Sequence, residues 1–344
     1  MRQLIAGALI AALVAGCTPK ADPPQATATL TERSVTVVVP EGFDAPFLEF
    51  ATKTHGYGMF VKQGSPALAR LFRTTDGGQS WHEVAHPRTV ADNHQLYVAG
   101  PDTVVLLAEP HSWHVTHDGG KTWTEKPYSP TGPMPDEYPD YTNHELRKGK
   151  TVLPGFEESQ VVEDGQHGLW QASVRDGKAV TAVSVPGSTS FSLVPVELQP
   201  GRNVMLARIA VSPDGLDVWL IAEQEPPSLS GPRSVRMKAS GLPLLWRWEN
   251  GAWKACPVTG VKDDPQHSYS VTPVGAGTLM LTAPIGTGYF TDRFTLVPGT
   301  PKLSWSGRLA DGTIWGSGQD AGVVYLSTGS GSQRDWIRVQ LSRS

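Results

Sequence analysis

Two short segments of this chain repeat one pattern, and that pattern constrains the fold more than any other feature of the sequence. Residues 74–81 read TTDGGQSW and residues 116–123 read THDGGKTW, so both fit Ser/Thr-x-Asp-x-Gly-x-Ser/Thr-Trp. An Asp side chain accepts hydrogen bonds from nearby backbone N–H groups, and Gly adopts positive φ without a steric penalty. Each segment is therefore predicted to be a tight turn between two β-strands.

The repeated pattern resembles the Asp-box, or BNR repeat, of β-propeller proteins such as sialidases, sortilin-type receptors and photosystem II assembly factors. In those families the box joins the third and fourth strands of a blade, so the resemblance implies an all-β propeller. A residue with the same turn role in two repeats is expected to belong to the scaffold, and both Asp residues are interpreted as structural rather than catalytic. The residues with this expected role are Thr74, Asp76, Gly78, Ser80 and Trp81 in the first copy and Thr116, Asp118, Gly120, Thr122 and Trp123 in the second.

A second repeat, a turn followed by an apolar run, gives the number of blades. Each copy is predicted to be the hairpin between the first and second strands of a blade. Six hairpins favour six blades, although seven would also fit the length at about 45 residues per blade. The strands within 34–40 and 336–341 are expected to pair in one blade and so close the ring. The six hairpins lie at residues 55–63, 100–109, 163–172, 212–223, 275–284 and 309–318.

The amino terminus predicts the location of the protein. Residues 1–16 carry Arg2 and a short apolar run, which is typical of a secretory signal and too short for a membrane span. The run ends in Val14-Ala15-Gly16-Cys17, which resembles the lipobox of bacterial lipoproteins and implies lipid attachment at Cys17. Thr18 follows where an Asp would favour the inner membrane, so an outer-membrane lipoprotein facing the periplasm is expected. Residues 17–31 are interpreted as the lipidated Cys and a flexible tether, and residues 32–344 as a single propeller domain.

Charge and motif chemistry exclude several other classes of function. A formal net charge of −4 provides no basic field for nucleic acid. The string His82-Glu-Val-Ala-His86 matches a zinc-protease motif, but a strand separates its histidines by about 13 Å, too far for one metal ion. His111, His114 and His117 are likewise expected to be surface or packed residues, so no metal and no cofactor is predicted. Four arginines could converge as a sialidase-type carboxylate site only if the fold brings them together: Arg202, Arg208, Arg247 and Arg293.

Two insertions, at 127–150 and 224–243, are the candidate recognition segments. The first is rich in Tyr, Pro and acids and is expected to project into solvent, either as a recognition loop or as a solvated spacer. Its candidate recognition residues are Tyr128, Asp136, Glu137, Tyr138, Asp140 and Tyr141. The second carries a small basic cluster, Arg233, Arg236 and Lys238. It is interpreted either as an arm that forms salt bridges with the acidic loop or as a solvated charge run.

Two functions of different classes remain open from the sequence. The first is a non-enzymatic scaffold that binds a protein partner for assembly or immunity, held at the membrane by its lipid. The second is a glycan-binding or glycoside-hydrolysing propeller of the Asp-box type, since tryptophan rings can stack on sugars. A hydrolase requires two carboxyl groups about 5–9.5 Å apart, and sequence alone does not pair acids from separate blades.

Overall fold

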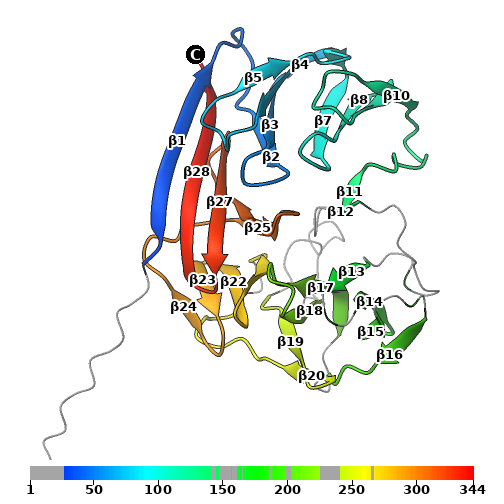
Figure 1. Cartoon of the computed structure of the whole chain (residues 1–344), viewed down its shortest axis with the longest axis vertical. Coiled ribbons are helices and arrows are strands. Elements are labelled where there is room, and N and C mark those ends of the chain that lie inside the picture. The colour runs from blue at the N-terminus through cyan, green and yellow to red at the C-terminus, as the bar shows by residue number, and fades with distance from the viewer. Residues whose placement is uncertain are drawn as a thin grey trace, which may run out of the picture.

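The chain folds into a six-bladed β-propeller. The computed structural model describes residues 27–140, 145–146, 156, 161–164, 166, 168–185, 188, 190–198, 203–224, 241–264 and 267–344. Within these residues, six sheets, each built on four consecutive antiparallel strands, surround a central axis, with the first strand of each blade innermost (Figure 1). The predicted signal peptide, Cys17 and the basic cluster of the second insertion lie outside the described residues.

Each blade is formed by four consecutive strands. Blade 1 contains β2 (Phe47–Phe50), β3 (Gly56–Lys62), β4 (Ala67–Thr74) and β5 (His82–Val84), and β6 (Val90–Ala91) also pairs with β4. Blade 2 contains β7 (Asn93–Val98), β8 (Val104–Glu109), β9 (Ser112–Thr116) and β10 (Thr124–Pro127). Blade 3 contains β13 (Val162–Asp164), β14 (Gly168–Arg175), β15 (Lys178–Ser184) and β16 (Phe191–Val194). Blade 4 contains β17 (Val204–Val211), β18 (Val218–Gln224), β19 (Leu244–Glu249) and β20 (Ala252–Ala255).

The remaining strands complete the ring. Blade 5 contains β21 (Val271–Gly275), β22 (Thr278–Ala283), β23 (Gly286–Phe290) and β24 (Phe294–Leu296). Blade 6 contains β25 (Trp305–Arg308), β26 (Ile314–Ser317), β27 (Val323–Ser330) and β28 (Gln333–Arg343), together with β1 (Thr29–Val37). A small two-stranded sheet, β11 (Pro139–Asp140) and β12 (Glu145–Leu146), lies within the first insertion.

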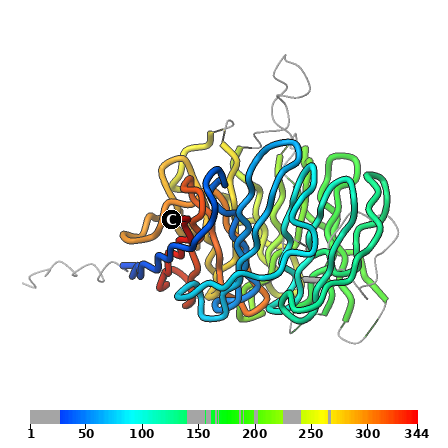
Figure 2. The backbone as a smooth tube through the Cα atoms, turned by 90° about the horizontal axis from the view of Figure 1, so that it is seen from above, coloured from blue at the N-terminus to red at the C-terminus, as the bar shows by residue number. Residues whose placement is uncertain are grey.

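The two ends of the described chain close blade 6, as the sequence predicts. β1 pairs in parallel with β28, from Thr29 opposite Asp335 to Val37 opposite Arg343. The N-terminal and C-terminal segments therefore lie side by side at one edge of the molecule (Figure 2). β1 begins slightly ahead of the predicted domain start at residue 32 because its ladder with β28 extends that far.

The order of strands gives the ring two different faces. All six predicted hairpins join the first and second strands of a blade, and both Asp-boxes join the third and fourth. Because successive strands are antiparallel, these hairpins and boxes lie on one face, here called the Asp-box face. Backbone hydrogen bonds from Gly77 N to Thr54 O (2.8 Å) and from Gly119 N to Asp102 O (2.9 Å) join each box to the hairpin of its own blade. On the opposite face the first strands begin and the second strands end.

Among the described residues, apolar layers join blades 1 and 2, 3 and 4, 4 and 5, 5 and 6, and 6 and 1. At the interface of blades 3 and 4, Trp170 is fully buried and packs edge-to-face against Trp248 and Trp253, with ring centroids 5.0 and 5.4 Å away. Strands buried on both faces explain the near-continuous apolar runs of the second strands, such as Val104–Glu109. Cys256 is a free, half-buried thiol beside β20.

Candidate functional site

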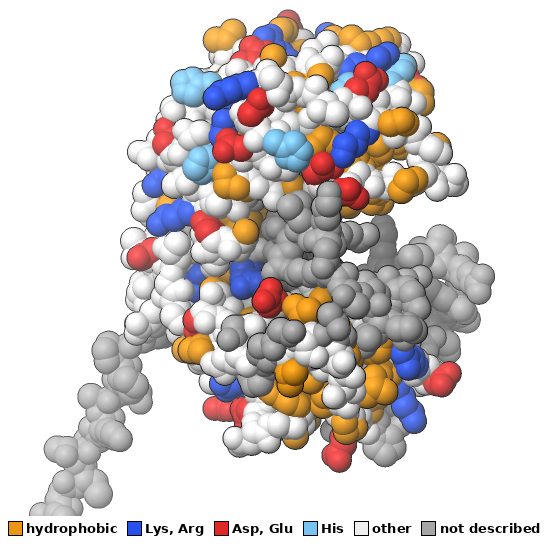
Figure 3. Space-filling model, turned by 45° about the vertical axis from the view of Figure 1, so that its right-hand side comes forward, with side chains coloured by type: hydrophobic (Ala, Val, Ile, Leu, Met, Phe, Trp, Pro, Cys, Tyr) orange, Lys and Arg blue, Asp and Glu red, His pale blue; other side chains and the backbone are white. Residues whose placement is uncertain are grey.

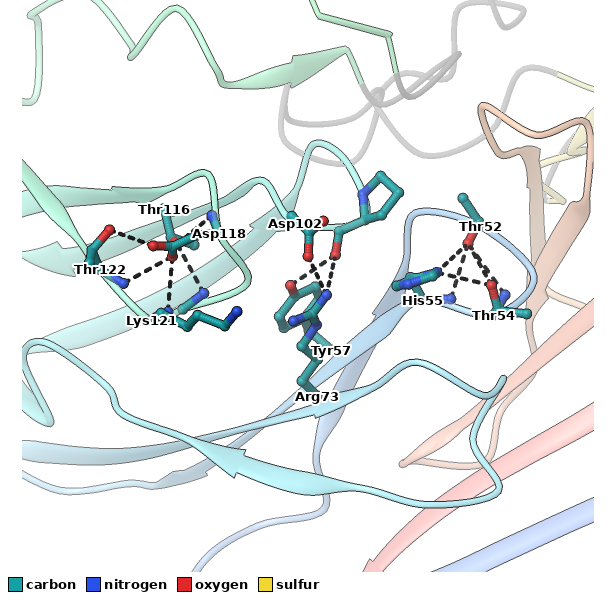
Figure 4. Close-up of polar contacts among 12 residues, drawn as sticks. Thr52, Thr54, His55, Tyr57, Arg73, Asp102, Thr116, Asp118, Lys121 and Thr122 are labelled. Carbon is teal, nitrogen blue, oxygen red and sulfur yellow. Dashed lines mark hydrogen bonds and ion pairs between the residues drawn. The ribbon is translucent and has the colours of Figure 1, made fainter.

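The Asp-box carboxylates are fully used within their own turns. Thr116 Oγ1 donates to Asp118 Oδ1 (2.8 Å) and Thr122 Oγ1 to Oδ2 (2.6 Å), while the backbone N–H groups of Lys121 and Thr122 donate to Oδ1 (3.0 and 2.9 Å; Figure 4). Asp76 accepts the same four bonds from Thr74, Gln79 and Ser80. Such bonds favour the charged form of a carboxylate.

The electrostatics of the boxes follow from these bonds. Burial acts to raise the pKa of Asp76, but the hydrogen bonds from Ser80, Thr74 and Gln79 outweigh it and lower the pKa to about 2. Hydrogen bonds from Thr122 are the main cause that holds the pKa of Asp118 well below its usual range. A permanently ionised carboxylate whose oxygens are occupied by its own turn is poorly suited to proton transfer.

The box glycines and tryptophans have equally local roles. Gly78 and Gly120 have φ of +86° and +92°, and an added Cβ would lie 2.3 Å from Val339 Cγ1 and 2.1 Å from Val84 Cγ1 respectively. Only glycine therefore fits where the box approaches the neighbouring strand. Trp81 is buried against Phe50, and the Trp123 indole donates to Ala85 O at 3.0 Å.

An alanine substitution separates this scaffold role from a functional one. Asp76→Ala removes the acceptor of four hydrogen bonds and is expected to lower the free energy of unfolding by about 1–2 kcal/mol. Binding of any partner at low temperature is expected to remain unchanged. Thermal melting and a binding assay on the same sample measure both effects. Lost binding with an unaltered melting temperature would contradict the structural interpretation.

The histidine motifs do not form a metal centre in the described part of the chain, where no group of three or more His, Cys, Asp or Glu side chains is arranged to hold a metal ion. His82 lies on strand β5, as the repeat predicts, and His86 packs edge-to-face on His94 of β7 (centroids 5.4 Å apart). His114 is buried on β9 beside Ser112, whose hydroxyl lies 2.9 Å from Nε2. His111 and His117 flank β9 and are exposed.

The tyrosine-rich insertion differs from its prediction. Its described residues do not all face solvent, because Tyr138 packs on Tyr97 (4.7 Å between centroids) and on Trp113 (6.0 Å). Tyr128 also packs on Trp113 at 6.0 Å and donates to Glu109 Oε1 at 3.0 Å. The reason is the apolar face of blade 2 that is turned away from blade 1, formed by Val105, Leu107, Trp113 and Val115, which these amphipathic rings cover.

The acidic residues of the same insertion differ in their burial. Glu137 is half-buried and accepts a hydrogen bond from Lys126 Nζ at 2.6 Å, with His117 Nε2 at 3.5 Å. Asp136 is exposed. The side chain of Asp140, and the whole of Tyr141, lie outside the described residues. Among the described residues of the insertion, Tyr128 and Tyr138 are therefore the ones that cover blade 2.

A pocket of about 370 Å³, here called the axial pocket, lies between the first strands of blades 4, 5 and 6, which are the innermost strands of these blades. Its charged side chains are Arg208 of β17, Glu223 of β18 and Arg308 of β25. Arg208 donates to Val271 O (2.7 Å) and Arg308 to Ser212 O (3.4 Å). Burial lowers the pKa of Arg208, an effect that the charge of Glu223 opposes.

The rim and the floor of this pocket differ in character. Trp305 and Leu206, at the start of β25 and near the start of β17, form the rim and are 53% and 48% exposed. The floor is polar, because buried Thr272 and Ser306 lie 2.9 Å apart through their hydroxyls. By strand direction the rim belongs to the opposite face, where β18 ends in Gln224 and the second insertion begins.

A larger hollow of about 590 Å³ on the flank of blade 1 is a weaker candidate. Its charged lining includes Arg70 and Glu83, which neutralise each other through two hydrogen bonds of 2.7 and 2.6 Å. On the described part of the face drawn in Figure 3, positive and negative side chains are interspersed.

Of the four arginines considered from the sequence, the three that the structure describes do not converge. Arg208 lines the axial pocket, whereas Arg247 forms an ion pair with Asp217 at 2.7 Å, Arg293 is exposed, and Arg202 lies outside the described residues. The second pocket arginine is Arg308, which sequence reasoning missed. The available signal was its place at the end of a first strand, directly before the hairpin 309–318.

Comparison with known proteins gives structural likeness alone. No protein-family model matches the sequence, and no curated protein matches it. The structure is similar to one described as YCF48 bound to D1 peptide, at 16% identity over 92% of this chain and 88% of that chain, with a TM-score of 0.32. It is also similar to an alpha-L-arabinanase from Penicillium chrysogenum (11% identity, 92% and 99% of the chains, TM-score 0.36). A sialidase from Trypanosoma rangeli gives 9% identity, 92% and 58% of the chains, and a TM-score of 0.34.

These structures are too distant to indicate a function. The fold is assigned from the strand pairing of the chain itself. The two Asp-boxes, the six four-stranded sheets and the closure through β1 and β28 describe a six-bladed Asp-box β-propeller.

Proposed function

We propose that this protein is a non-enzymatic, lipid-anchored propeller that faces the periplasm and binds a partner protein, as an assembly or immunity scaffold. The axial pocket is the observation that carries the proposal. Its described lining contains a single carboxylate, Glu223, whereas glycoside hydrolysis uses two carboxyl groups about 5–9.5 Å apart. Exposed Trp305 and Leu206 at its rim offer the apolar contacts that protein recognition uses.

Two acidic residues on the first strands of other blades accept hydrogen bonds from within the fold. This use favours a binding role over a catalytic one for the propeller. Glu49 of β2 accepts a hydrogen bond from Val98 N at 2.7 Å. Asp164 of β13 accepts bonds from Gly168 N (3.1 Å) and from the Trp170 indole (2.5 Å). A carboxylate with these partners stabilises a blade and has little capacity left for a substrate.

The start of the described chain is compatible with a lipid tether. β1 lies at the outer edge of blade 6, away from the axis (Figure 1), and Ala28 N is held by Pro298 O at 2.9 Å. A tether that joins the domain there leaves the axial pocket accessible. No helix among the described residues is long and apolar enough to cross a bilayer.

Loss of the proposed lipid site should release the protein. Cys17→Ser removes the thiol that would carry the lipid, and the variant is expected to leave the membrane fraction. Fractionation and labelling with radioactive palmitate measure this, with Cys256→Ser as the matched control that keeps the lipid. A Cys17→Ser protein that remains in the membrane fraction and still incorporates palmitate would overturn the anchor.

Crosslinked envelopes provide the test of protein binding. Wild-type protein is expected to co-purify with a specific polypeptide, and Trp305→Ala to lose most of it. Leu216→Ala is the matched control, since Leu216 is 61% exposed in the β17–β18 hairpin on the Asp-box face. No enriched polypeptide with wild-type protein, or equal recovery with Trp305→Ala, would contradict the proposal.

A glycan ligand is the second candidate, and the exposed indole of Trp305 is the observation that favours it, because sugar rings stack on tryptophan. A glycan array and an assay for released reducing sugar distinguish the two candidates. Trp305-dependent binding to an oligosaccharide, with no polypeptide captured, would favour the glycan. Release of reducing sugar would favour a hydrolase.

A further inference from the structure

A further pocket, here called the blade 4 pocket, lies at the outer part of blade 4. It has a volume of about 440 Å³ and is formed by the start of β19, the end of β20 and the chain that follows β20. β20 is the outermost strand of this blade (Figure 1). By strand direction these segments meet on the face opposite the Asp-boxes, which is also the face of the axial pocket rim.

The walls of the blade 4 pocket are mainly apolar, and they include Leu242, Leu244, Trp246, Pro257 and Val258. Two side chains of its lining carry N–H groups, and both already donate to backbone carbonyls. The Trp246 indole donates to Glu197 O at 3.2 Å, and Gln224 Nε2 donates to Leu242 O at 2.8 Å. A ligand that hydrogen-bonds here must therefore supply the donors itself.

The charge of the described lining is negative. It contains two acidic residues, Glu197 and Asp263, and no Lys, Arg or His. Glu197 is exposed, and its carboxylate has no hydrogen bond or ion pair with the described residues. Asp263 Oδ1 accepts a hydrogen bond from Leu242 N at 2.7 Å, so its second oxygen can accept from a ligand.

The basic residues that are nearest in the chain do not belong to this lining. Arg247 forms an ion pair with Asp217 at 2.7 Å, and Lys254 forms one with Glu249 at 3.3 Å. Lys262 is exposed and lies outside the lining. The two carboxylates of the pocket are therefore suited to a cation brought by a ligand.

Apolar walls and acidic residues together specify the class of ligand. A long basic side chain packs its apolar stem on such walls while its charged head reaches polar groups. An arginine is favoured over a lysine, because its planar guanidinium carries five N–H donors and matches the two oxygens of a carboxylate.

We propose that the blade 4 pocket binds an arginine side chain of the partner polypeptide, with Glu197 and Asp263 as ligands of the guanidinium. This inference rests on the proposed protein-binding function and specifies which chemistry of the partner is recognised. It also places a second contact on the same face as exposed Trp305.

The test uses the full chain in detergent and two short synthetic peptides that have one central residue between leucines. That residue is arginine in one peptide and citrulline, its uncharged isostere, in the other, and affinity is measured by isothermal titration calorimetry. The arginine peptide is expected to bind about tenfold to a hundredfold more tightly, as charge-assisted hydrogen bonds predict. Equal affinity for the two peptides would overturn the inference.

Substitutions in the lining locate the effect. Glu197→Gln is expected to weaken binding of the arginine peptide about tenfold and to leave the citrulline peptide unchanged. Asp335→Asn is the matched control, because it removes one negative charge from an exposed site on blade 6. Ala255→Phe, at an exposed position of β20 that lines the pocket, is expected to obstruct both peptides. Unchanged arginine binding in both Glu197→Gln and Ala255→Phe, with unaltered melting, would overturn the assignment.

The thiol of Cys256 gives an independent measure of occupancy, because this half-buried residue lines the pocket. Alkylation by N-ethylmaleimide is followed by mass spectrometry of the peptide that contains Cys256. The arginine peptide is expected to slow this modification several-fold at concentrations that saturate binding. An unchanged rate at saturation would place the peptide elsewhere and overturn the inference.

The failure of this inference can be distinguished from the failure of the proposed function. If a polypeptide still co-purifies from crosslinked envelopes while the two peptides bind equally, protein binding stands and the arginine site is wrong. If the arginine peptide binds through Glu197 but no polypeptide co-purifies, the site for a basic side chain stands and its assignment to a protein partner is wrong.

Discussion

Replacing Trp170 with alanine is expected to lower the free energy of unfolding by about 3–5 kcal/mol, the largest effect we expect from a single substitution. The side chain is fully buried where blade 3 meets blade 4, against Trp248 and Trp253. Its removal leaves a cavity and takes one hydrogen-bond donor from Asp164. Urea titration measures the loss, and an m-value near that of wild type would show that the substituted protein still unfolds cooperatively.

Trp305→Ala is the matched control for that experiment. Trp305 is 53% exposed at the pocket rim, so its loss is expected to change stability by less than about 0.5 kcal/mol. The two variants thus separate a tryptophan that stabilises the fold from one that serves binding. A loss of less than about 1 kcal/mol for Trp170→Ala would contradict the described packing of blades 3 and 4.

Acidification from pH 7.5 to 5 is expected to destabilise the protein, chiefly through His86. Burial is the main cause that lowers the pKa of His86 to about 3, and the nearby positive charges of protonated His94 and His114 would add to it. Burial also lowers the pKa of His94 and of His114. The geometry agrees, because His86 Nε2 and His94 Nδ1 are buried without a hydrogen-bond partner among the described residues.

The sign and the pH window follow from proton uptake. An unfolded histidine takes up a proton below about pH 6.5, while folded His86 remains neutral until about pH 3. The unfolded state therefore binds more protons in this interval, and stability falls as the pH falls, by up to about 1.4 kcal/mol per pH unit for one histidine. At pH 5, His86 is expected to have lowered the free energy of unfolding by about 2 kcal/mol relative to neutral pH. The low pKa of Asp76 affects stability only at more acidic pH, between its unfolded value near 4 and its folded value of about 2.

A neutral substitution isolates this effect. His86→Gln is expected to flatten the dependence of stability on pH between 6.5 and 5, whereas His117→Gln, at an exposed site, should preserve it. Urea midpoints at several pH values provide the comparison. An unchanged pH profile in His86→Gln would show that His86 is already accessible to protons in the folded protein.

The sequence predicts the architecture well because the relevant interactions are local. Asp118 bonds within four residues of itself, so the turn is encoded in one short segment. The same applies to the hairpins and to the turn at residues 249–253, which joins the third and fourth strands of blade 4 with Asn250 and Gly251 at positive φ. The pairing of β1 with β28 follows from two unpartnered strands at the ends of the domain.

The packing of the first insertion and the set of residues that line the pocket depend on contacts between distant parts of the chain. No local sequence pattern encodes these contacts. Tyr138 covers blade 2 because the face of β8 and β9 that is turned away from blade 1 is apolar, and composition alone does not distinguish such a cover from a solvated loop. Arg208 and Arg308 are a hundred residues apart and share one pocket only because the ring places blades 4, 5 and 6 around the axis.

By itself the sequence determined the repeat, the turns, the number of hairpins and the closure of the ring, since each depends on residues a few positions apart or on strands that need a partner. Only the tertiary structure decided which charged groups meet, because side chains from different blades come together through ring closure and not through spacing along the chain. The fold of this protein is therefore encoded by short segments of its sequence, whereas the candidate site depends on residues that lie far apart in the chain.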